Sequence, residues 1–312
     1  MNDCVKYTKS STGLVRDSST PTALQPKLPD ATRGEAMFRV YSRSALRPGC
    51  LTYAVLLGVL WVHRSMLCSP DSSIGAEYVS AHSERRVISY SLYGSDARYT
   101  AGAVENLSRL RTTYPGWEMR IYHDDSVPPH LLKKLSVRGA ELVDMTGDTR
   151  NPMTWRFLVA SDQSVSRWCS RDIDARLSVR ERLCVDIWLT SGKSTHIIRD
   201  HPSHVKTPIM GGTWCGTNQS FPEMASLLES ESIENRFNAD QEFLAEFIWP
   251  RVKHDVLQHV SFGCDELQGS LPIPVRRSGL EHVGAVFING KMRRSDLRLL
   301  AEAIQRKEEC TL

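Results

Sequence analysis

The sequence lacks the cysteine and histidine spacing that builds structural zinc sites. It contains no C-x-x-C pair and no Cys/His pattern with zinc-binding spacing, so we expect no thiolate metal site. Six of the eight cysteines lie beyond residue 67, and some can pair in an oxidising compartment, although the sequence leaves the pairing open. The cysteines are Cys4, Cys50, Cys68, Cys169, Cys184, Cys215, Cys264 and Cys310.

The chain also lacks a strong charge of either sign. Its net charge is +3, from 39 Lys and Arg against 36 Asp and Glu. Residues 1–49 alone carry +4, with eight basic and four acidic side chains, so the rest of the chain is close to neutral. The basic excess therefore belongs to an N-terminal tail, and no basic face favours a nucleic-acid partner.

Long apolar runs are scarce, because only residues 50–62 ("CLTYAVLLGVLWV") form one. These 13 residues would rise about 20 Å as a helix, short of the ~30 Å hydrocarbon core, and counting on to Cys68 gives a marginal span. We expect a signal anchor that makes the chain a single-pass type II membrane protein with its C-terminal part in the Golgi or ER lumen. A cleaved signal peptide and a core helix of a soluble protein are the alternatives.

The composition predicts five regions. The tail is rich in Ser, Thr, Pro and charge, so we expect it to be disordered and cytosolic. Two N-x-S/T sequons, at Asn106 and Asn218, are compatible with passage through the secretory pathway. The regions are the tail (1–49), the anchor (50–67), a polar stem (68–85), a main domain (86–290) and a C-terminal helix or tail (291–312).

Strand-like and helix-like segments alternate through the main domain. This alternation predicts an α/β fold, Rossmann-like, with a mostly parallel sheet flanked by helices. Such sheets bind ligands at the carboxyl ends of their strands. We expect strands over 86–94, 117–125, 140–146 and 167–174, and helices over 100–114, 127–139, 153–165 and 237–250.

A pair of aspartates stands at one of these strand ends, in "WCSRDIDARLS" (168–178). Asp172 and Asp174 flank one isoleucine, between Arg171 and Arg176. By itself this stretch fits either a self-paired surface charge cluster or a carboxylate pair for a metal ion. Its place at a strand end favours the second reading, because two carboxylates there can share one Mg²⁺ or Mn²⁺ with a diphosphate. The arginines would then orient the aspartates or assist with phosphate.

A series of short blocks accompanies this pair and resembles a little-characterised group of GT-A fold, D-x-D-type glycosyltransferases. No single block is diagnostic, but their order and spacing over residues 88 to 287 carry the resemblance. The blocks read "ISYSLYG", "YPGWEMRIYHDD", "WRFLVASD", "RDIDARLSVRE", "HIIRDHPSH", "IMGGTWCG", "NADQEFLAEFIWP", "HVSFGC" and "HVGAVF".

The resemblance implies a metal-dependent enzyme that moves a sugar from a UDP- or GDP-sugar to a glycan or glycoprotein acceptor. Asp172, Asp174 and His259 would hold Mn²⁺ or Mg²⁺, although Val260 follows His259 where the group usually has an acid. Asp240 would serve as general base or acceptor contact, or else cap its helix. The residues expected at the donor are Ser89, Tyr93, Arg156, Asp162, Asp172, Gly212 and Trp214.

Several other polar residues near these blocks have two interpretations. Arg156 is either a donor contact or one half of a helix-surface ion pair. Arg180 and Glu181 suit an intrahelical or capping role better than catalysis, and His201 and His204 suit a structural role better than ligand binding. A catalytically silent GT-A-like domain that binds glycans or a partner remains the alternative function. A phosphohydrolase fits the sequence around the aspartates less well.

Overall fold

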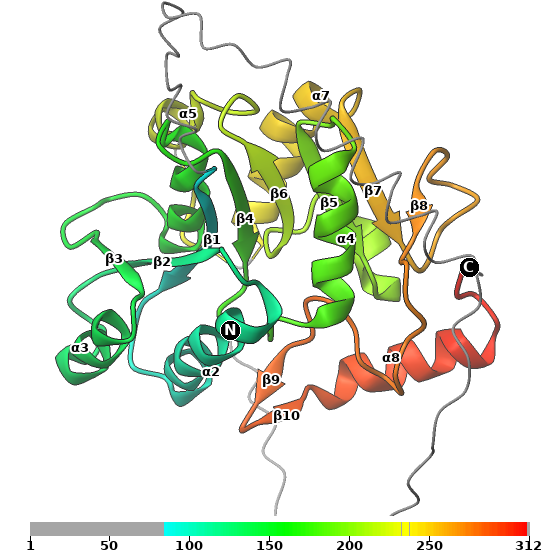
Figure 1. The fold of residues 1–312 in the computed structure, drawn as a ribbon, viewed down its shortest axis with the longest axis horizontal. Helices are drawn as coiled ribbons and strands as arrows, with labels where there is room; N and C mark the ends of the chain where they lie inside the picture. Colours follow the sequence, from blue (N-terminus) through cyan, green and yellow to red (C-terminus); the bar gives the residue numbers. More distant parts are fainter. Residues whose placement is uncertain (1–83, 232, 237, 311–312) are drawn as a thin grey trace, which may run out of the picture. The chain divides into compact units, whose positions relative to one another are not determined.

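The main domain is built on one eight-stranded mixed sheet. The computed structural model describes residues 84–231, 233–236 and 238–310, all of which belong to one compact unit. The strand order is β3-β2-β1-β4-β6-β5-β7-β8, and all neighbours run parallel except β6, which is antiparallel to both β4 and β5. The expectation of a mostly parallel sheet flanked by helices is therefore confirmed (Figure 1).

The strands are short, as in most α/β domains. A separate two-stranded hairpin, β9 with β10, precedes the last helix. The strands are β1 (Arg86–Leu92), β2 (Glu118–His123), β3 (Glu141–Asp144), β4 (Arg167–Arg171), β5 (Thr195–Arg199), β6 (Thr213–Thr217), β7 (Val256–Val260), β8 (Leu271–Pro272), β9 (Phe287–Ile288) and β10 (Lys291–Met292).

The helical segments fall close to the expected places. The predicted helix over 237–250 is a run of three short segments, α6, η3 and α7, of which η3 is a π-helix. The helical segments are α2 (Ala97–Thr113), α3 (Pro129–Val137), η1 (Pro152–Ser161), α4 (Val179–Thr190), η2 (Pro202–Lys206), α5 (Met224–Ser230), α6 (Ala239–Phe243), η3 (Leu244–Ile248), α7 (Trp249–Val252) and α8 (Arg294–Gln305).

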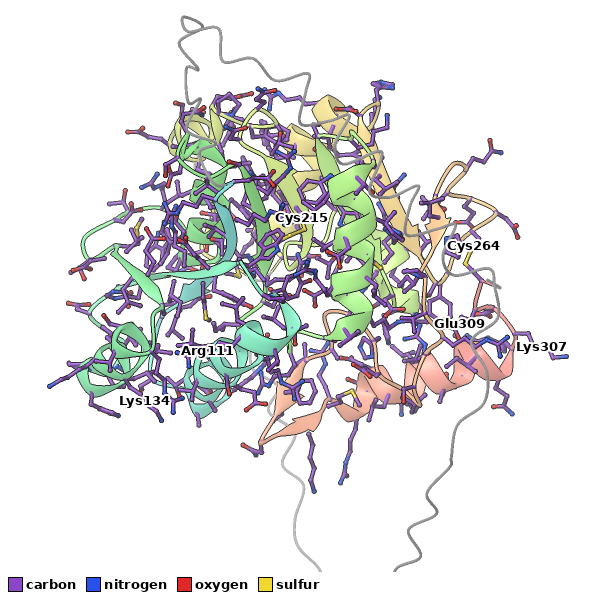
Figure 2. All side chains as sticks on the ribbon, viewed as in Figure 1. Arg111, Lys134, Cys215, Cys264, Lys307 and Glu309 are labelled. Atoms are coloured by element: carbon purple, nitrogen blue, oxygen red, sulfur yellow. A yellow bond between two sulfur atoms is a disulfide. The ribbon has the colours of Figure 1, made fainter. Side chains whose placement is uncertain are left out.

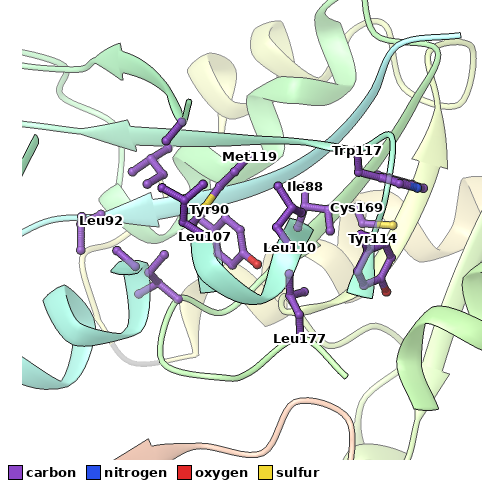
Figure 3. Packing of buried hydrophobic residues seen from close by; sticks show 14 of the residues in the cluster. Ile88, Tyr90, Leu92, Leu107, Leu110, Tyr114, Trp117, Met119, Cys169 and Leu177 are labelled. Atoms are coloured by element: carbon purple, nitrogen blue, oxygen red, sulfur yellow. The ribbon is translucent and has the colours of Figure 1, made fainter. Parts of the chain in front are cut away.

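Both faces of the sheet are covered by helices. One core joins α2, α3 and α4 to the sheet, and a second core joins η1, α5 and η3 to its other face. Figure 3 shows the first core, where Ile88 and Tyr90 of β1 meet Leu107 and Leu110 of α2. Since neighbouring side chains on a strand point to opposite faces, Ser89 and Ser91 fall on the η1 side.

The segment after Asn151 is a 3-10 helix, η1, rather than the α-helix expected over 153–165. The two serines of β1 supply the reason. The Ser89 hydroxyl donates to the Arg156 carbonyl (2.8 Å), and the Arg156 amide donates to the Ser91 hydroxyl (3.0 Å). Backbone groups that an α-helix would pair internally are thus bonded to the sheet.

The described residues contain two disulfides and one free, buried cysteine, Cys184. Cys169 and Cys215 are register partners on β4 and β6, and the second disulfide joins Cys264 to Cys310 near the C-terminal end (Figure 2).

No helix within residues 84–310 has the length and apolarity to cross a membrane. The predicted anchor, tail and most of the stem lie outside the described residues, so the topology and the lumenal location stay predictions.

One stripe of α2 lies directly against the turn that follows β4. Gly102 of this stripe is buried, and a Cβ there would fall far inside contact distance of the Ile173 carbonyl oxygen. Only glycine lets the helix backbone approach the turn this closely.

We predict that Gly102→Ala destabilises the protein by about 1–3 kcal/mol, because a side chain forced into a close-packed contact shifts the backbone. Helix propensity alone predicts the opposite sign, a gain of about 1 kcal/mol. Urea unfolding monitored by circular dichroism measures the difference. A more stable variant would show that α2 does not press on this turn.

Candidate functional site

One cavity lies at the carboxyl ends of the neighbouring strands β1 and β4. Strand β1 has β2 on one side and β4 on the other, so the chain reverses its direction across the sheet at this point. In open α/β sheets such a switch point is the usual ligand site. The cavity has a volume of about 270 Å³. It is lined by Ser91, Leu92, Tyr93, Arg98, Tyr99, Met153, Arg156, Asp172, Ile173, Asp174, Met210, Gly211, Gly212, Asn238, Asp240, Gln241, Val286 and Arg293.

Three carboxylates reach this cavity from two separate segments. Asp172 and Asp174 come from the turn after β4, and Asp240 comes from α6. The Asp172 side chain is 38% exposed, whereas those of Asp174 and Asp240 are 8% and 7% exposed. The structure therefore brings the D-x-D pair together with the predicted general base, as one site requires.

Arg156 joins two of these carboxylates. One arm of its buried guanidinium pairs with Asp172, and the other donates to Asp240 at 2.8 Å. Burial opposes the positive charge, but the two carboxylates outweigh it and raise the pKa of Arg156. The sequence suggested either a donor contact or a helix-surface ion pair for Arg156. In the structure Arg156 instead bridges two carboxylates of the site.

Two glycines make room for the bridge. A Cβ on Gly212 would overlap the Asp172 carboxylate, and one on Gly211 would lie 2.5 Å from the Arg156 Nη2 atom and 2.8 Å from the Asp240 Oδ2 atom. The expected role of Gly212 was close approach to a donor sugar. In the structure it permits close approach of Asp172, and both glycines also line the cavity.

Asp174 has a different counterion, Arg98 of α2, with which it forms an ion pair. Burial and the nearby Asp172 charge raise the pKa of Asp174, and Arg98 offsets part of that rise. Burial also raises the pKa of Asp240. Each buried carboxylate is thus held next to a guanidinium because an unpaired buried charge is costly.

Asp240 does not cap its helix. The N-cap residue is Asn238, which adopts a left-handed conformation (φ 68°) and makes no side-chain capping bond. The Asp240 carboxylate is left to pair with Arg156 and face the cavity, beside Tyr93 at the end of β1.

Three predicted donor residues are not brought to the cavity. Ser89 and Trp214 are fully buried, Ser89 bonded to η1 and Trp214 packed edge-on against Trp168. Asp162 follows η1 and does not line the cavity, and Arg120 of β2 pairs with it at 2.7 Å. A short sequence motif does not show that Trp214 packs into the core or that Asp162 lies outside the cavity.

His259 also lies away from the aspartates. It is fully buried on β7, and its Nδ1 atom lies 2.9 Å from Nε2 of His196 on the neighbouring β5. Burial lowers the pKa of His259 to about 4, so the imidazole is neutral. This pair is part of the sheet, and the predicted metal shell of Asp172, Asp174 and His259 does not assemble.

Arg171 and Arg176, expected beside the aspartates or a phosphate, do not line the cavity, and neither does Arg180. Arg171 donates to Glu181 at 2.7 Å, and Arg180 donates to both oxygens of the buried Asp200, at 2.7 and 2.8 Å. Arg176 donates to the Asp174 and Ala175 carbonyls.

His201 and His204 also lie off the cavity. The His201 ring bonds the Asp296 carbonyl at 3.0 Å, and His204 accepts from the Asp200 amide at 3.3 Å. Their interpretation as structural residues is consistent with these contacts.

Arg98 and the face of α2 that carries it were not predicted from the sequence. Arg98, Gly102 and Asn106 follow one another at intervals of four, which places them on one side of a helix. All three contact the turn after β4: Arg98 through Asp174, Gly102 through its backbone and Asn106 through its amide. The spacing of these residues can be seen in the sequence, but the fold decides that they contact the turn after β4.

The site offers a divalent cation two hard oxygen ligands. Within residues 84–310, no three His, Cys, Asp or Glu side chains gather closely enough to enclose a metal. Mg²⁺ and similar ions are nonetheless often held by one or two carboxylates, with water and substrate phosphates completing the shell. Asp172 and Asp174, adjacent on one turn and facing one cavity, fit this type of site.

Comparison with known proteins gives only distant structural similarity. No protein-family model and no curated protein matches the chain. Glycosyltransferase GlyE of Streptococcus pneumoniae TIGR4 has a TM-score of 0.40 and 14% identity, over 56% of this chain and 45% of that one. The mannosyltransferase PcManGT of Pyrobaculum calidifontis, in complex with GDP-Man and Mn²⁺, has a TM-score of 0.38 and 14% identity, over 62% and 58%.

Glucosyl-3-phosphoglycerate synthase of Mycobacterium tuberculosis, in complex with Mg²⁺ and UDP, has a TM-score of 0.39 and 14% identity, over 62% of this chain and 74% of that one. The chain spans less than two thirds of the length of GlyE and PcManGT. Scores below 0.5 do not assign a family.

The turn after β4 is held chiefly by Asn106. Its amide donates to the carbonyls of Ile173 (3.0 Å) and Ala175 (2.9 Å), and its oxygen accepts from the Leu177 amide (3.1 Å). Asn106 is buried and fully bonded, so this sequon is not open to glycosylation in the folded domain.

We predict that Asn106→Ala lowers the free energy of unfolding by about 2–4 kcal/mol, because three buried backbone groups lose their partner. Ser108→Ala is the matched control, since Ser108 is exposed and its loss removes the same sequon. Thermal and urea unfolding of both variants measure the effect. Equal stability of the two variants would contradict the structural role of the amide.

Proposed function

We propose that this protein is a metal-assisted, nucleotide-sugar-dependent glycosyltransferase of the GT-A, D-x-D kind. The observation that carries the proposal is the convergence of Asp172, Asp174 and Asp240 on one cavity at the switch point of the sheet. A UDP- or GDP-sugar is the proposed donor, and a glycan or glycoprotein is the proposed acceptor.

The diphosphate of the donor suits the exposed side of the D-x-D pair. Asp172 and Asp174 would hold Mn²⁺ or Mg²⁺, and the bound ion would neutralise the charge that develops on the leaving diphosphate. Tyr93 at the end of β1 lines the same cavity and offers a surface for the nucleoside. The backbone at Gly211 and Gly212 offers close approach for the sugar.

Asp240 suits the role of proton acceptor or acceptor-substrate contact. Burial raises the pKa of its carboxyl, which moves the group toward the range where a general base is effective. Arg156 fixes its orientation through a 2.8 Å bond. A proton taken from the acceptor hydroxyl would pass to the Asp240 carboxylate as that hydroxyl attacks the sugar.

The secretory pathway is the proposed location. Disulfides persist in oxidising compartments, so the Cys169–Cys215 and Cys264–Cys310 pairs support a lumenal domain. The apolar run at 50–62 supports a type II signal anchor, with a basic cytosolic tail before it.

A catalytically silent sugar-nucleotide- or glycan-binding domain is the second candidate. It is favoured by one observation: all three cavity carboxylates are already paired with arginines, and His259 lies elsewhere. Binding without turnover would distinguish this candidate from the enzyme.

We predict that the full-length chain binds UDP or GDP in the presence of Mn²⁺ and releases nucleotide from at least one sugar nucleotide. Asp172→Asn should weaken nucleotide binding about tenfold or more, because it removes a charged metal ligand. Isothermal titration calorimetry measures binding, and nucleotide release from a panel of UDP- and GDP-sugars measures turnover.

Asp162→Asn is the matched control for this experiment. It removes one carboxylate that pairs with Arg120 outside the cavity, so nucleotide affinity should be unchanged. If neither nucleotide binds the wild-type chain with Mn²⁺ or Mg²⁺, the transferase proposal fails. If nucleotide binds and no sugar nucleotide is turned over, the silent binding domain replaces the enzyme.

A further inference from the structure

Arg98 is the cavity arginine that pairs with Asp174. Its Nη2 atom pairs with the buried Asp174, while its Nε atom is buried and has no hydrogen-bond partner among the described residues. The guanidinium also lies over the Tyr99 ring, 5.1 Å from its centre. A long side chain held by one ion pair and 29% exposed can leave its partner without breaking a larger network.

The other two arginines of the cavity pair with other carboxylates. Arg156 is buried and bridges Asp172 and Asp240. Arg293 donates through Nε to both oxygens of Asp296, at 2.9 Å each. Arg98 is therefore the cavity arginine whose single carboxylate partner belongs to the D-x-D pair.

A divalent cation and Arg98 compete for the same carboxylate. Asp174 is buried enough that its charged form is stabilised by a counterion, which is Arg98 in this structure. The Asp174 side chain is only 8% exposed, which leaves little room for both. When a metal ion takes the carboxylate, the displaced guanidinium becomes an unpaired cation at the edge of the cavity, where a diphosphate is the matching anion.

We propose that Arg98 is an exchangeable counterion that couples metal binding to nucleotide binding. It neutralises Asp174 when no divalent cation is bound, gives way to the cation, and then pairs with the diphosphate. This inference rests on the proposed function for its nucleotide half, whereas the exchange at Asp174 concerns only residues of this chain.

The exchange makes the two ligands help each other. Metal alone must break the Arg98–Asp174 pair without compensation, so it binds weakly. Metal with a diphosphate gives Arg98 a new partner, and by linkage each ligand raises the affinity for the other by the same factor. Removing Arg98 should therefore strengthen binding of metal alone and weaken binding of nucleotide.

Calorimetric titration of the full-length chain tests both halves. The probes are Mn²⁺ alone, and UDP or GDP at saturating Mn²⁺. In Arg98→Met, which keeps the aliphatic stem, we expect Mn²⁺ alone to bind about tenfold more tightly, because one charge-assisted pair no longer opposes it. Affinity for the nucleotide that binds the wild type should fall about fivefold or more.

Two further variants locate the effect. Arg111→Met removes the same charge from an exposed position on α2 (Figure 2), and it should leave both affinities unchanged. Asp174→Asn should abolish the gain that Arg98→Met produces for Mn²⁺. If Arg98→Met does not fold, Arg98→Lys should show a smaller gain in the same direction, because a strongly hydrated ammonium pairs less well.

Equal Mn²⁺ affinity in the wild type and Arg98→Met would overturn the proposal. So would a gain that persists with Asn at 174 or that Arg111→Met reproduces. If neither nucleotide binds the wild type but the Asp174-dependent gain for Mn²⁺ is present, the exchange stands and the proposed transferase function is what fails.

Discussion

The contact between one face of α2 and the turn after β4 is the constraint on which the candidate site depends. Gly102 lets the helix backbone reach the Ile173 carbonyl, and Asn106 satisfies three backbone groups of the turn. The turn is therefore held by α2 as well as by its own bonds, such as those from Arg176 to the Asp174 and Ala175 carbonyls. The rigid turn then presents both aspartates at the carboxyl end of β4, which is where a parallel sheet leaves space for a ligand.

The buried carboxylates of the site also require counterions. A charge removed from water needs a counterion close by, and the domain supplies guanidinium groups from α2 and η1. Arg156 also ties the turn after β4 to α6, so positioning and neutralisation are achieved by the same side chain. His259 lies away from the cavity and is not available as a metal ligand. Two carboxylates can still begin a metal shell that diphosphate oxygens and water complete.

Local patterns in the sequence predicted much of this arrangement. Alternating strand and helix segments predicted the sheet. The position of Asp172 after a predicted strand placed it at the carboxyl ends of the strands. Both predictions follow from short-range periodicity. The exception among the elements is η1, where Ser89 and Ser91 bond the Arg156 backbone from a strand 60 or more residues away. The helix propensities of residues 153–165 cannot reveal hydrogen bonds to a distant strand.

The sequence by itself determined the fold class and the place of the aspartate pair at the carboxyl end of a strand. Strand alternation and residue order are local properties, so both can be recognised from the sequence. Only the tertiary structure decided which polar residues meet there. It joined Asp240 and Arg98 to the aspartates and left Asp162, after η1, and His259, on β7, outside the cavity. The physical reason is that a motif shows spacing along the chain, whereas a shared cavity depends on which strands become neighbours and which face each side chain takes.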